Sequence, residues 1–475
     1  MNKRILMISN IFPPKFIGGY EINAYEVGKF LAGEGEQVRV LSSDFMVNSE
    51  GEEMLLPVSR ALQGESKGLG SFTPKAHSEL YNSWNIRQLA NEIEQFKPEM
   101  VILWNLQDIG SFGLIKYLEF LKIPTLMYLM DNIFMDIDRD GDKFEELERI
   151  FGSFKIPENF KVIAMSERLV KEIAEKMKIE LKGYKLLPGW VKGTVSKSEI
   201  DEGKRVVRDK SKDKVDISHY EDYIRLAGQV DEQGREKIRF VFSSRIAKHK
   251  GVFLIPEAVK ILRERDYNNF VVDIYGLGEV LVLKDLIKDY EGYINYKGVY
   301  QKEEVLEVLA GYDALIFPTW EREAFGLVVI EGAHEGVIPL FTEGIGAGEW
   351  FKDDFLVMEQ SAKSLSAAME RVLSLSRDEL SFKKEEVKVL AQKNFNFDNV
   401  MIPFNSFIKE NFRGSFKVEG REVFQIERAM AYLYGDLPVG ELAYDRRELA
   451  EKFFKVYSML PKTVQRLIVA IAKAL

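Results

Sequence analysis

Apolar residues along this chain occur in short runs that alternate with amphipathic helical segments. The first run, Arg4 to Ser9, is followed by a loop from Asn10 to Gly19 that contains Pro-Pro and Gly-Gly pairs. A helical pattern then covers Glu21 to Ala32, and a second apolar run covers Gln37 to Ser42. Strand, glycine loop, helix and strand in this order form the first unit of a doubly wound sheet, so this segment predicts a parallel α/β domain.

The alternation continues to about residue 192. It predicts strands at Met100–Trp104, Thr125–Met130 and Lys161–Met165, and a helix at Ser166–Met177. The segment Tyr184–Val191 predicts a strand that ends in a Pro-Gly turn. The segment Ser49–Ser78 is richer in Gly, Ser and Glu, which predicts a long loop. Residues 1–192 are therefore predicted to form an N-terminal Rossmann-like domain.

A second alternating series begins after a strongly charged stretch, residues 193–237, which we interpret as a linker or an insertion. The predicted strands are Arg239–Ser244, Phe270–Tyr275, Ile294–Gly298, Ala314–Pro318 and Ile338–Phe341. The predicted helices are Val252–Arg265, Asp285–Tyr290, Lys302–Ala310 and Leu327–Gly336. Residues 238–397 thus predict a second Rossmann-like domain, and we expect ligands in a cleft at the carboxyl ends of the strands.

The chain beyond Asp398 is predicted to be helical, and this segment, residues 398–475, can cross back to the N-terminal domain. Its end, Pro461–Leu475, has the pattern of a short basic amphipathic helix. Two interpretations of that helix stay open: a packing or dimer contact, and peripheral contact with a membrane.

Composition excludes several classes of function. The 475 residues include no cysteine, so disulfides, thiolate catalysis and cysteine–zinc sites are excluded. Acidic residues outnumber basic ones, 75 to 66, which argues against a dedicated nucleic-acid binder. The apolar run at the N-terminus is too short for a signal peptide, and no stretch approaches the roughly 20 apolar residues that span a bilayer. We therefore expect a cytoplasmic protein.

The densest cluster of candidate chemistry is Phe317–Gly336, FPTWEREAFGLVVIEGAHEG. A strand runs into a loop that opens a helix near Ala324 to Gly326, and a helix N-terminus suits a diphosphate. Glu323 lies just before this helix, where its carboxylate can meet a ligand near the loop. Glu331 lies two turns deeper, where its carboxylate can accept hydrogen bonds from a vicinal diol such as a ribose.

A second cluster follows the strand at the start of the second domain. Arg245 and Lys250 occupy the loop FSSRIAKHKG, where two cations can clamp a diphosphate and stabilise it as a leaving group. The pair Gly276 and Gly278 lacks the third glycine of a dinucleotide fingerprint. We interpret it as a turn near a nucleotide base, or as a turn only.

Together these clusters resemble the retaining GT-B glycosyltransferases, in particular glycosyltransferase family 4. The family motif E-x-F-G-x-x-x-x-E is matched by Glu323, Phe325, Gly326 and Glu331, and its Arg…Lys-Gly pattern by Arg245, Lys250 and Gly251. The resemblance covers roughly Arg4 to Asn411. It implies a GT-B fold and retaining, metal-independent sugar transfer without a cofactor, in which the leaving phosphate takes the acceptor proton.

The resemblance also implies roles for residues. The donor, a nucleotide diphosphate-sugar with UDP or GDP, would contact Gly18, Gly19, Arg245, Lys250, Gly276, Glu323, Ala324, Phe325, Gly326, Leu327, Val328 and Glu331. Of these, Glu323, Arg245 and Lys250 would be catalytic. The acceptor, a saccharide or lipid-linked saccharide, would lie on the side of the N-terminal domain.

One position departs from the family pattern. A histidine that touches the donor sugar usually ends the strand corresponding to Thr125–Met130, but here Met130 stands in its place and Asp131 follows. Either Asp131 substitutes for that histidine, or the sugar is held differently. Two further functions stay open at this point: a nucleotide-sugar epimerase of the same architecture, and an inactive subunit that binds a sugar nucleotide.

Overall fold

The computed structural model divides the chain into two compact units. Unit 1 comprises Met1–Ala164, Val170–Lys185 and Phe407–Leu475, and unit 2 comprises Met165–Leu169 and Leu186–Ser406. The structure describes residues 3–14, 19–43, 56–64, 80–132, 155–192, 236–319, 323–418, 422–427 and 430. Almost all of the predicted linker (residues 193–235) lies outside the described residues. The predicted helix at 461–475 also lies outside them.

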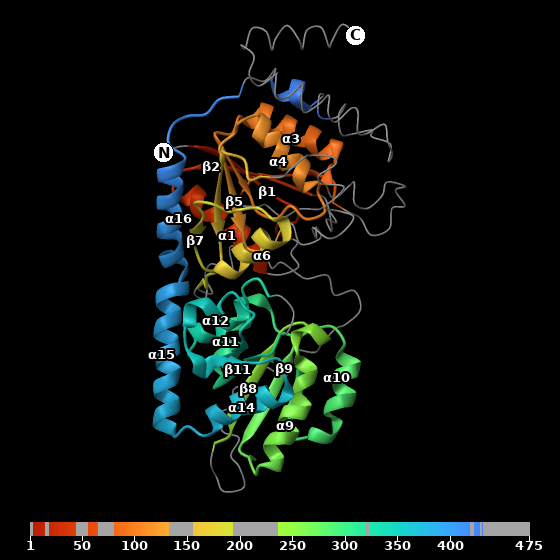
Figure 1. The fold of residues 1–475 in the computed structure, drawn as a ribbon, viewed down its shortest axis with the longest axis vertical. Helices are drawn as coiled ribbons and strands as arrows, with labels where there is room; N and C mark the ends of the chain where they lie inside the picture. Colours follow the sequence, from red (N-terminus) through yellow and green to blue (C-terminus); the bar gives the residue numbers. More distant parts are fainter. Residues whose placement is uncertain are drawn as a thin grey trace. The chain divides into compact units, whose positions relative to one another are not determined.

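Unit 1 is built on a seven-stranded sheet with the order β3-β2-β1-β4-β5-β6-β7 (Figure 1). Its strands are β1 (Arg4–Ser9), β2 (Gln37–Ser43), β3 (Val58–Leu62), β4 (Met100–Leu103), β5 (Thr125–Leu129), β6 (Phe160–Ala164) and β7 (Lys185–Leu186). The pairs from β3 through β6 are all parallel. Every residue of β4 and β5 is buried, as expected for strands covered on both faces.

The helices that accompany this sheet in the described part of the chain include α1 (Gly19–Gly33), α3 (Ser83–Phe96), α4 (Ser111–Phe120) and α6 (Glu167–Met177). The start of α3 shows why it forms where it does. The side chain of Asn82 accepts a hydrogen bond from the backbone N–H of Asn85 at 3.1 Å, which satisfies one of the free donors at the helix N-terminus. Lys97 then ends the helix in the left-handed conformation.

One prediction for unit 1 was wrong, and another is confirmed only in part. The predicted loop Ser49–Ser78 contains β3, an edge strand whose residues are mostly half-buried and which pairs with β2. Such a strand depends on its neighbour for hydrogen bonds and needs no apolar run of its own, so the hydrophobic pattern does not reveal it. The strand predicted at Tyr184–Val191, with a Pro-Gly turn at its end, is confirmed in part. β7 covers only Lys185–Leu186 and ends before Pro188, which has no N–H to donate to a ladder.

Unit 2 is built on a six-stranded parallel sheet with the order β10-β9-β8-β11-β12-β13. Its strands are β8 (Ile238–Ser243), β9 (Phe270–Tyr275), β10 (Ile294–Gly298), β11 (Ala314–Phe317), β12 (Ile338–Thr342) and β13 (Val357–Met358). Its α-helices include α9 (Ile255–Glu264), α10 (Val280–Ile287), α11 (Val305–Ala310), α12 (Leu327–His334), α14 (Ala362–Leu373) and α15 (Arg377–Phe395). The predicted α/β fold with two Rossmann-like sheets is confirmed.

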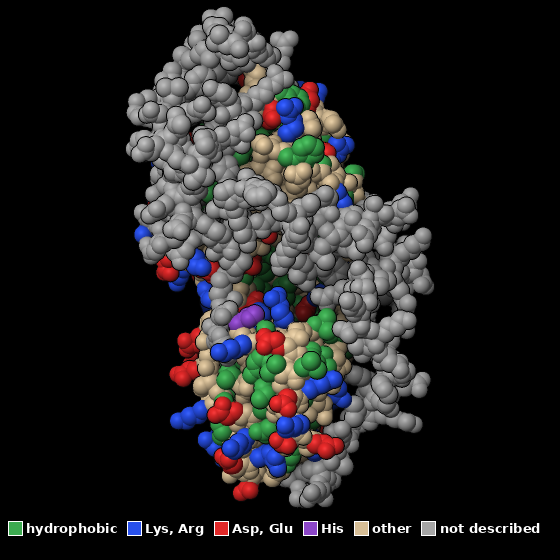
Figure 2. Space-filling model, turned by 90° about the vertical axis from the view of Figure 1, so that its right-hand side faces the viewer, with side chains coloured by type: hydrophobic (Ala, Val, Ile, Leu, Met, Phe, Trp, Pro, Cys, Tyr) green, Lys and Arg blue, Asp and Glu red, His purple; other side chains and the backbone are tan. Residues whose placement is uncertain are grey.

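The helix predicted at Asp285–Tyr290 begins earlier than expected, at Val280. Its first turn is unusual because Leu281 is 84% exposed and Val282 is 50% exposed. An exposed apolar turn has no polar face, so the sequence pattern does not show it as an amphipathic helix. Figure 2 views the side on which α10 lies and shows apolar side chains interspersed with charged ones over unit 2.

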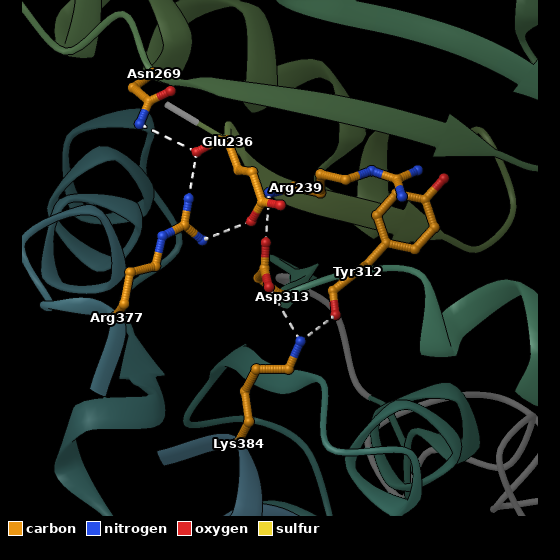
Figure 3. A network of polar contacts seen from close by, with 7 residues as sticks. All are labelled: Glu236, Arg239, Asn269, Tyr312, Asp313, Arg377 and Lys384. Carbon is orange, nitrogen blue, oxygen red and sulfur yellow. Dashed lines mark hydrogen bonds and ion pairs between the residues drawn. The ribbon is translucent and has the colours of Figure 1, made fainter. Parts of the chain in front are cut away.

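A polar network joins α15 to the amino ends of β8 and β11 (Figure 3). Asp313 accepts hydrogen bonds from the backbone N–H of Arg239 at 2.9 Å and from Lys384 Nζ at 3.0 Å, and Lys384 also donates to the carbonyl of Tyr312. Arg377, at the start of α15, donates to the carbonyl of Glu236 at 2.5 Å. The network lies at the amino ends of the strands, opposite their carboxyl ends, where ligands are expected. It therefore stabilises the fold of unit 2.

The last long helix described is α16 (Phe397–Asn411), and residues 422–427 are also helical. Among the described residues, no helix has both the length and the apolar character that a membrane span requires.

Candidate active site

The strand order of unit 2 determines where a site can form. From β8 the chain moves to β9 and β10 on one side, and then returns to place β11 on the other side of β8. The crevice between β8 and β11, outside their carboxyl ends, is the topological switch point of the sheet. The loops that leave these two strands carry the two clusters of candidate residues, at Arg245 to Gly251 and at Glu323 to Glu331.

The two loops are in direct contact. Lys250 Nζ donates to Glu323 Oε2 at 2.5 Å, and both side chains are about four-fifths buried. Thr319 Oγ1 donates to the carbonyl of His249 at 3.0 Å. Gly251 has a φ of +73°, and a Cβ atom there would lie 1.9 Å from the carbonyl oxygen of Pro318. The structure therefore brings together the lysine and the first glutamate that the sequence singles out.

The loop after β11 ends at the N-terminus of α12. Gly326, with a φ of +91°, is the N-cap, and Leu327 and Val328 form the first turn. Backbone N–H groups at such an end have no partner inside the helix, and the helix dipole favours an anion there. Phe325 is buried, whereas Ala324, Leu327 and Val328 are half-buried. The expected helix start is confirmed, and it places free donors beside the Lys250–Glu323 pair.

Glu331 lies on the second turn of α12 and is 8% exposed. Its Oε1 atom accepts a hydrogen bond from Lys302 Nζ. A buried carboxylate is costly unless a cation or hydrogen-bond donors compensate it, and Lys302 is the compensating cation.

Arg245 follows β8 and differs from Lys250 in its surroundings. Its side chain is exposed and makes no recorded hydrogen bond or ion pair with any described residue. Arginine binds phosphate through a planar fork of donors, so an exposed guanidinium on the same loop as Lys250 is well suited to an anionic ligand.

The glycines after β9 lie close to the loop after β8. A Cβ atom on Gly276 would lie 1.8 Å from the carbonyl oxygen of Ser244, and one on Gly278 would lie 2.2 Å from that of Ile246. Both positions therefore need glycine, whatever else they do.

The residues predicted in unit 1 form a separate group. Gly18 lies outside the described residues, and Gly19 is the first residue of α1. Met130 is 3% exposed and follows β5. Asp131 comes next and is half-buried, and its negative charge, after burial itself, raises the pKa of Tyr20.

Two features of unit 2 were missed by sequence reasoning. One is Lys302, which the hydrophobic pattern shows only as the start of a helix. The other is a hydroxyl pair formed by Ser243 and Tyr300, whose ring also packs edge-on against Tyr275. These residues are 57 positions apart in the chain, and no local sequence pattern indicates that they meet. No group of three or more acidic or histidine side chains suited to a metal ion occurs in the part of the chain that the structure describes.

Two parallel-sheet units of this order, with charged loops at the switch point of the second, define the GT-B class of fold. Comparison with known proteins agrees. Residues 229–388 match the family model described as glycosyl transferases group 1, which confirms the resemblance to glycosyltransferases over that range. No curated protein sequence matches the chain.

Solved structures share the fold over most of the chain. A glycosyltransferase from Rickettsia africae ESF-5 is 17% identical with a TM-score of 0.61, covering 87% of this chain and 100% of its own. Sucrose-phosphate synthase from Thermosynechococcus elongatus is 15% identical with a TM-score of 0.63, covering 86% of this chain and 99% of its own. Anabaena HepE, solved in complex with UDP and glucose, is 13% identical with a TM-score of 0.58, covering 86% of this chain and 100% of its own.

Proposed function

We propose that this protein transfers a sugar from a nucleotide diphosphate-sugar to a hydroxyl acceptor. The observation that carries the proposal is the Lys250–Glu323 ion pair at the N-terminus of α12, at the switch point of unit 2. The pair places a cation and a carboxylate beside free backbone donors, which is what a diphosphate joined to a sugar requires. The match of this unit to glycosyl transferases group 1 supports the proposal, as does the UDP-glucose complex of HepE.

In this proposal each residue of unit 2 has a distinct task. Lys250 and Arg245 neutralise the diphosphate, and the N–H groups at the start of α12 donate to its oxygens. These interactions strengthen as the bond between the sugar carbon and the phosphate oxygen breaks, because negative charge then grows on the leaving group. Glu323 faces the donor sugar, and Glu331 accepts hydrogen bonds from the ribose diol.

We further propose that transfer retains the configuration of the sugar. The acceptor oxygen forms its bond to the sugar carbon on the face from which the diphosphate departs, and the acceptor proton goes to an oxygen of the leaving phosphate. This route needs neither a metal ion nor a separate general base. We also propose that the acceptor is a saccharide or lipid-linked saccharide and that the donor nucleotide is UDP or GDP. Asp131 would contact the sugar or the acceptor.

The first test of this function is nucleotide binding by the variant Glu331→Ala. Hydrogen bonds to a charged group are worth roughly 1.5–3 kcal/mol, so the variant should bind UDP or GDP about 10- to 150-fold more weakly by calorimetry. Glu307→Ala removes an exposed glutamate of α11 and should bind as the wild type does. Equal affinity of the Glu331 variant and the wild type would contradict the assigned role.

Activity separates transfer from the other functions. The protein is incubated with UDP-, GDP-, ADP- and TDP-sugars, and nucleotide release is followed with and without a saccharide acceptor. Release that increases with acceptor supports transfer, and Arg245→Ala should lower that rate far more than it weakens binding of the nucleoside. Recovery of an epimerised donor would instead assign the epimerase reaction, and binding without turnover of any donor would assign a binding subunit.

A further inference from the structure

We propose that Lys302 is a positioning residue that orients Glu331 toward the ribose of the donor, an inference that rests on the proposed function. Lys302 Nζ donates to Glu331 Oε1, and the Glu331 carboxylate has no other recorded partner among the described residues. A carboxylate has about four lone-pair sites on its two oxygens. A lysine on one oxygen therefore leaves the other oxygen for the diol.

The lysine is held by a rigid local frame. It is the first residue of η4 (Lys302–Glu304), a short turn with a capping box in which the backbone N–H of Gln301 donates to Glu304 Oε2 at 2.7 Å. This turn leads directly into α11, where Val305 and Leu309 are buried. α11 packs against α12, which carries Glu331. Both ends of the ion pair are thus fixed on packed elements.

The frame explains why the interaction orients Glu331. Only 11% of the Glu331 side chain is exposed, so an uncompensated charge there is costly. Lys302 supplies the compensating charge and also removes rotational freedom from the carboxylate, so that less entropy is lost when the diol binds. The side chain of Lys302 is 37% exposed, which lets its ammonium stay hydrated while it holds Oε1.

The test compares nucleotides with and without the diol. Dissociation constants of UDP, GDP and their 2′,3′-dideoxy analogues are measured by calorimetry for the wild type, Lys302→Met and Lys302→Arg. We expect Lys302→Met to weaken binding of the ribonucleotide about tenfold and to leave binding of the dideoxy analogue within about twofold. Lys302→Arg keeps the cation and should stay within about threefold of the wild type for both ligands.

A matched control is Lys363→Met, which removes an exposed lysine elsewhere in unit 2 and should change neither constant. Tighter binding of the ribonucleotide by Lys302→Met would overturn the proposal, because lysine would then compete with ribose. An equal loss for both ligands would also overturn it and would assign Lys302 a role in folding alone. If the wild type binds none of the four nucleotides, the proposed function itself fails, which is a different result from a failure of the Lys302 variants.

Discussion

Gly251 lies where the loop from β8 contacts the loop from β11. A Cβ atom there would lie 1.9 Å from the carbonyl oxygen of Pro318 and 2.7 Å from its carbonyl carbon. Backbone cannot move aside as the end of a long side chain can, so the contact allows no side chain at this position. The glycine therefore permits the approach of Lys250 to Glu323 on which the proposed site depends.

We predict that Gly251→Ala destabilises unit 2. The positive φ of +73° costs an alanine about 1–2 kcal/mol, and the clash with Pro318 costs about 1–3 kcal/mol more. Chemical denaturation should therefore show a loss of about 2–5 kcal/mol. Gly292→Ala is the matched control, because Gly292 has a φ of +81° but no atom within 4 Å of its Cβ position, so only the backbone cost applies. Equal losses for the two variants would show that the Pro318 contact is relaxed at little cost.

At the scale of elements, the buried parallel strands could be predicted closely from the sequence. The predicted span for Phe270–Tyr275 agrees residue for residue with β9, in which every residue is buried. Strands buried on both faces are continuous apolar runs, and that local signal does not depend on neighbours. The start of α12 at Gly326 was predictable for a similar reason, because glycine, strand end and helix pattern coincide in one short segment.

Elements whose stability comes from neighbours could not be predicted. β3 owes its hydrogen bonds to β2, and α10 begins with an exposed apolar turn. The ion-pair partner of Glu331 could not be predicted for the same reason. Lys302 is 29 positions away in the chain, and nothing local in its sequence indicates a contact with α12. Pairs of this kind follow from strand order, which the hydrophobic pattern alone does not determine.

The attachment of α15 to the sheet can be tested through Lys384. We expect Lys384→Met to lower the stability of unit 2 by about 1–2 kcal/mol, because Asp313 loses a charged donor and the carbonyl of Tyr312 loses its lysine donor. Thermal and chemical denaturation measure the change. Lys393→Met, at an exposed position on the same helix, should leave stability unchanged. Because the network lies at the amino ends of the strands, away from the proposed nucleotide site, nucleotide affinity should stay the same in both variants. A loss of affinity in Lys384→Met would show that the network also affects the site.

At the scale of the whole molecule, the core of unit 1 contains large polar aromatic side chains. Tyr117 and Tyr128 are fully buried, and Trp104 packs against Tyr128 with 4.5 Å between ring centroids. Burial raises the pKa of Tyr128 far above its ordinary value near 10, and it raises the pKa of Tyr117 and Tyr20 as well. The core of unit 1 therefore requires these phenols to stay neutral.

This requirement makes the stability of unit 1 dependent on pH in the alkaline range, and Tyr128→Phe tests it. The unfolded chain releases the tyrosine proton above about pH 10, while the folded chain retains it, so the contribution of Tyr128 is fully present below that pH and falls as the pH rises. The loss amounts to roughly 1.4 kcal/mol per pH unit for one tyrosine. Near pH 8 the phenylalanine variant should be within about 1.5 kcal/mol of the wild type. Between about pH 10 and 11.5 it should become progressively more stable relative to the wild type, as measured by urea denaturation at each pH.

Tyr184→Phe, at a half-buried position of the same unit, is the control. A constant difference between Tyr128→Phe and the wild type across this range would show that the folded core tolerates the ionised phenol.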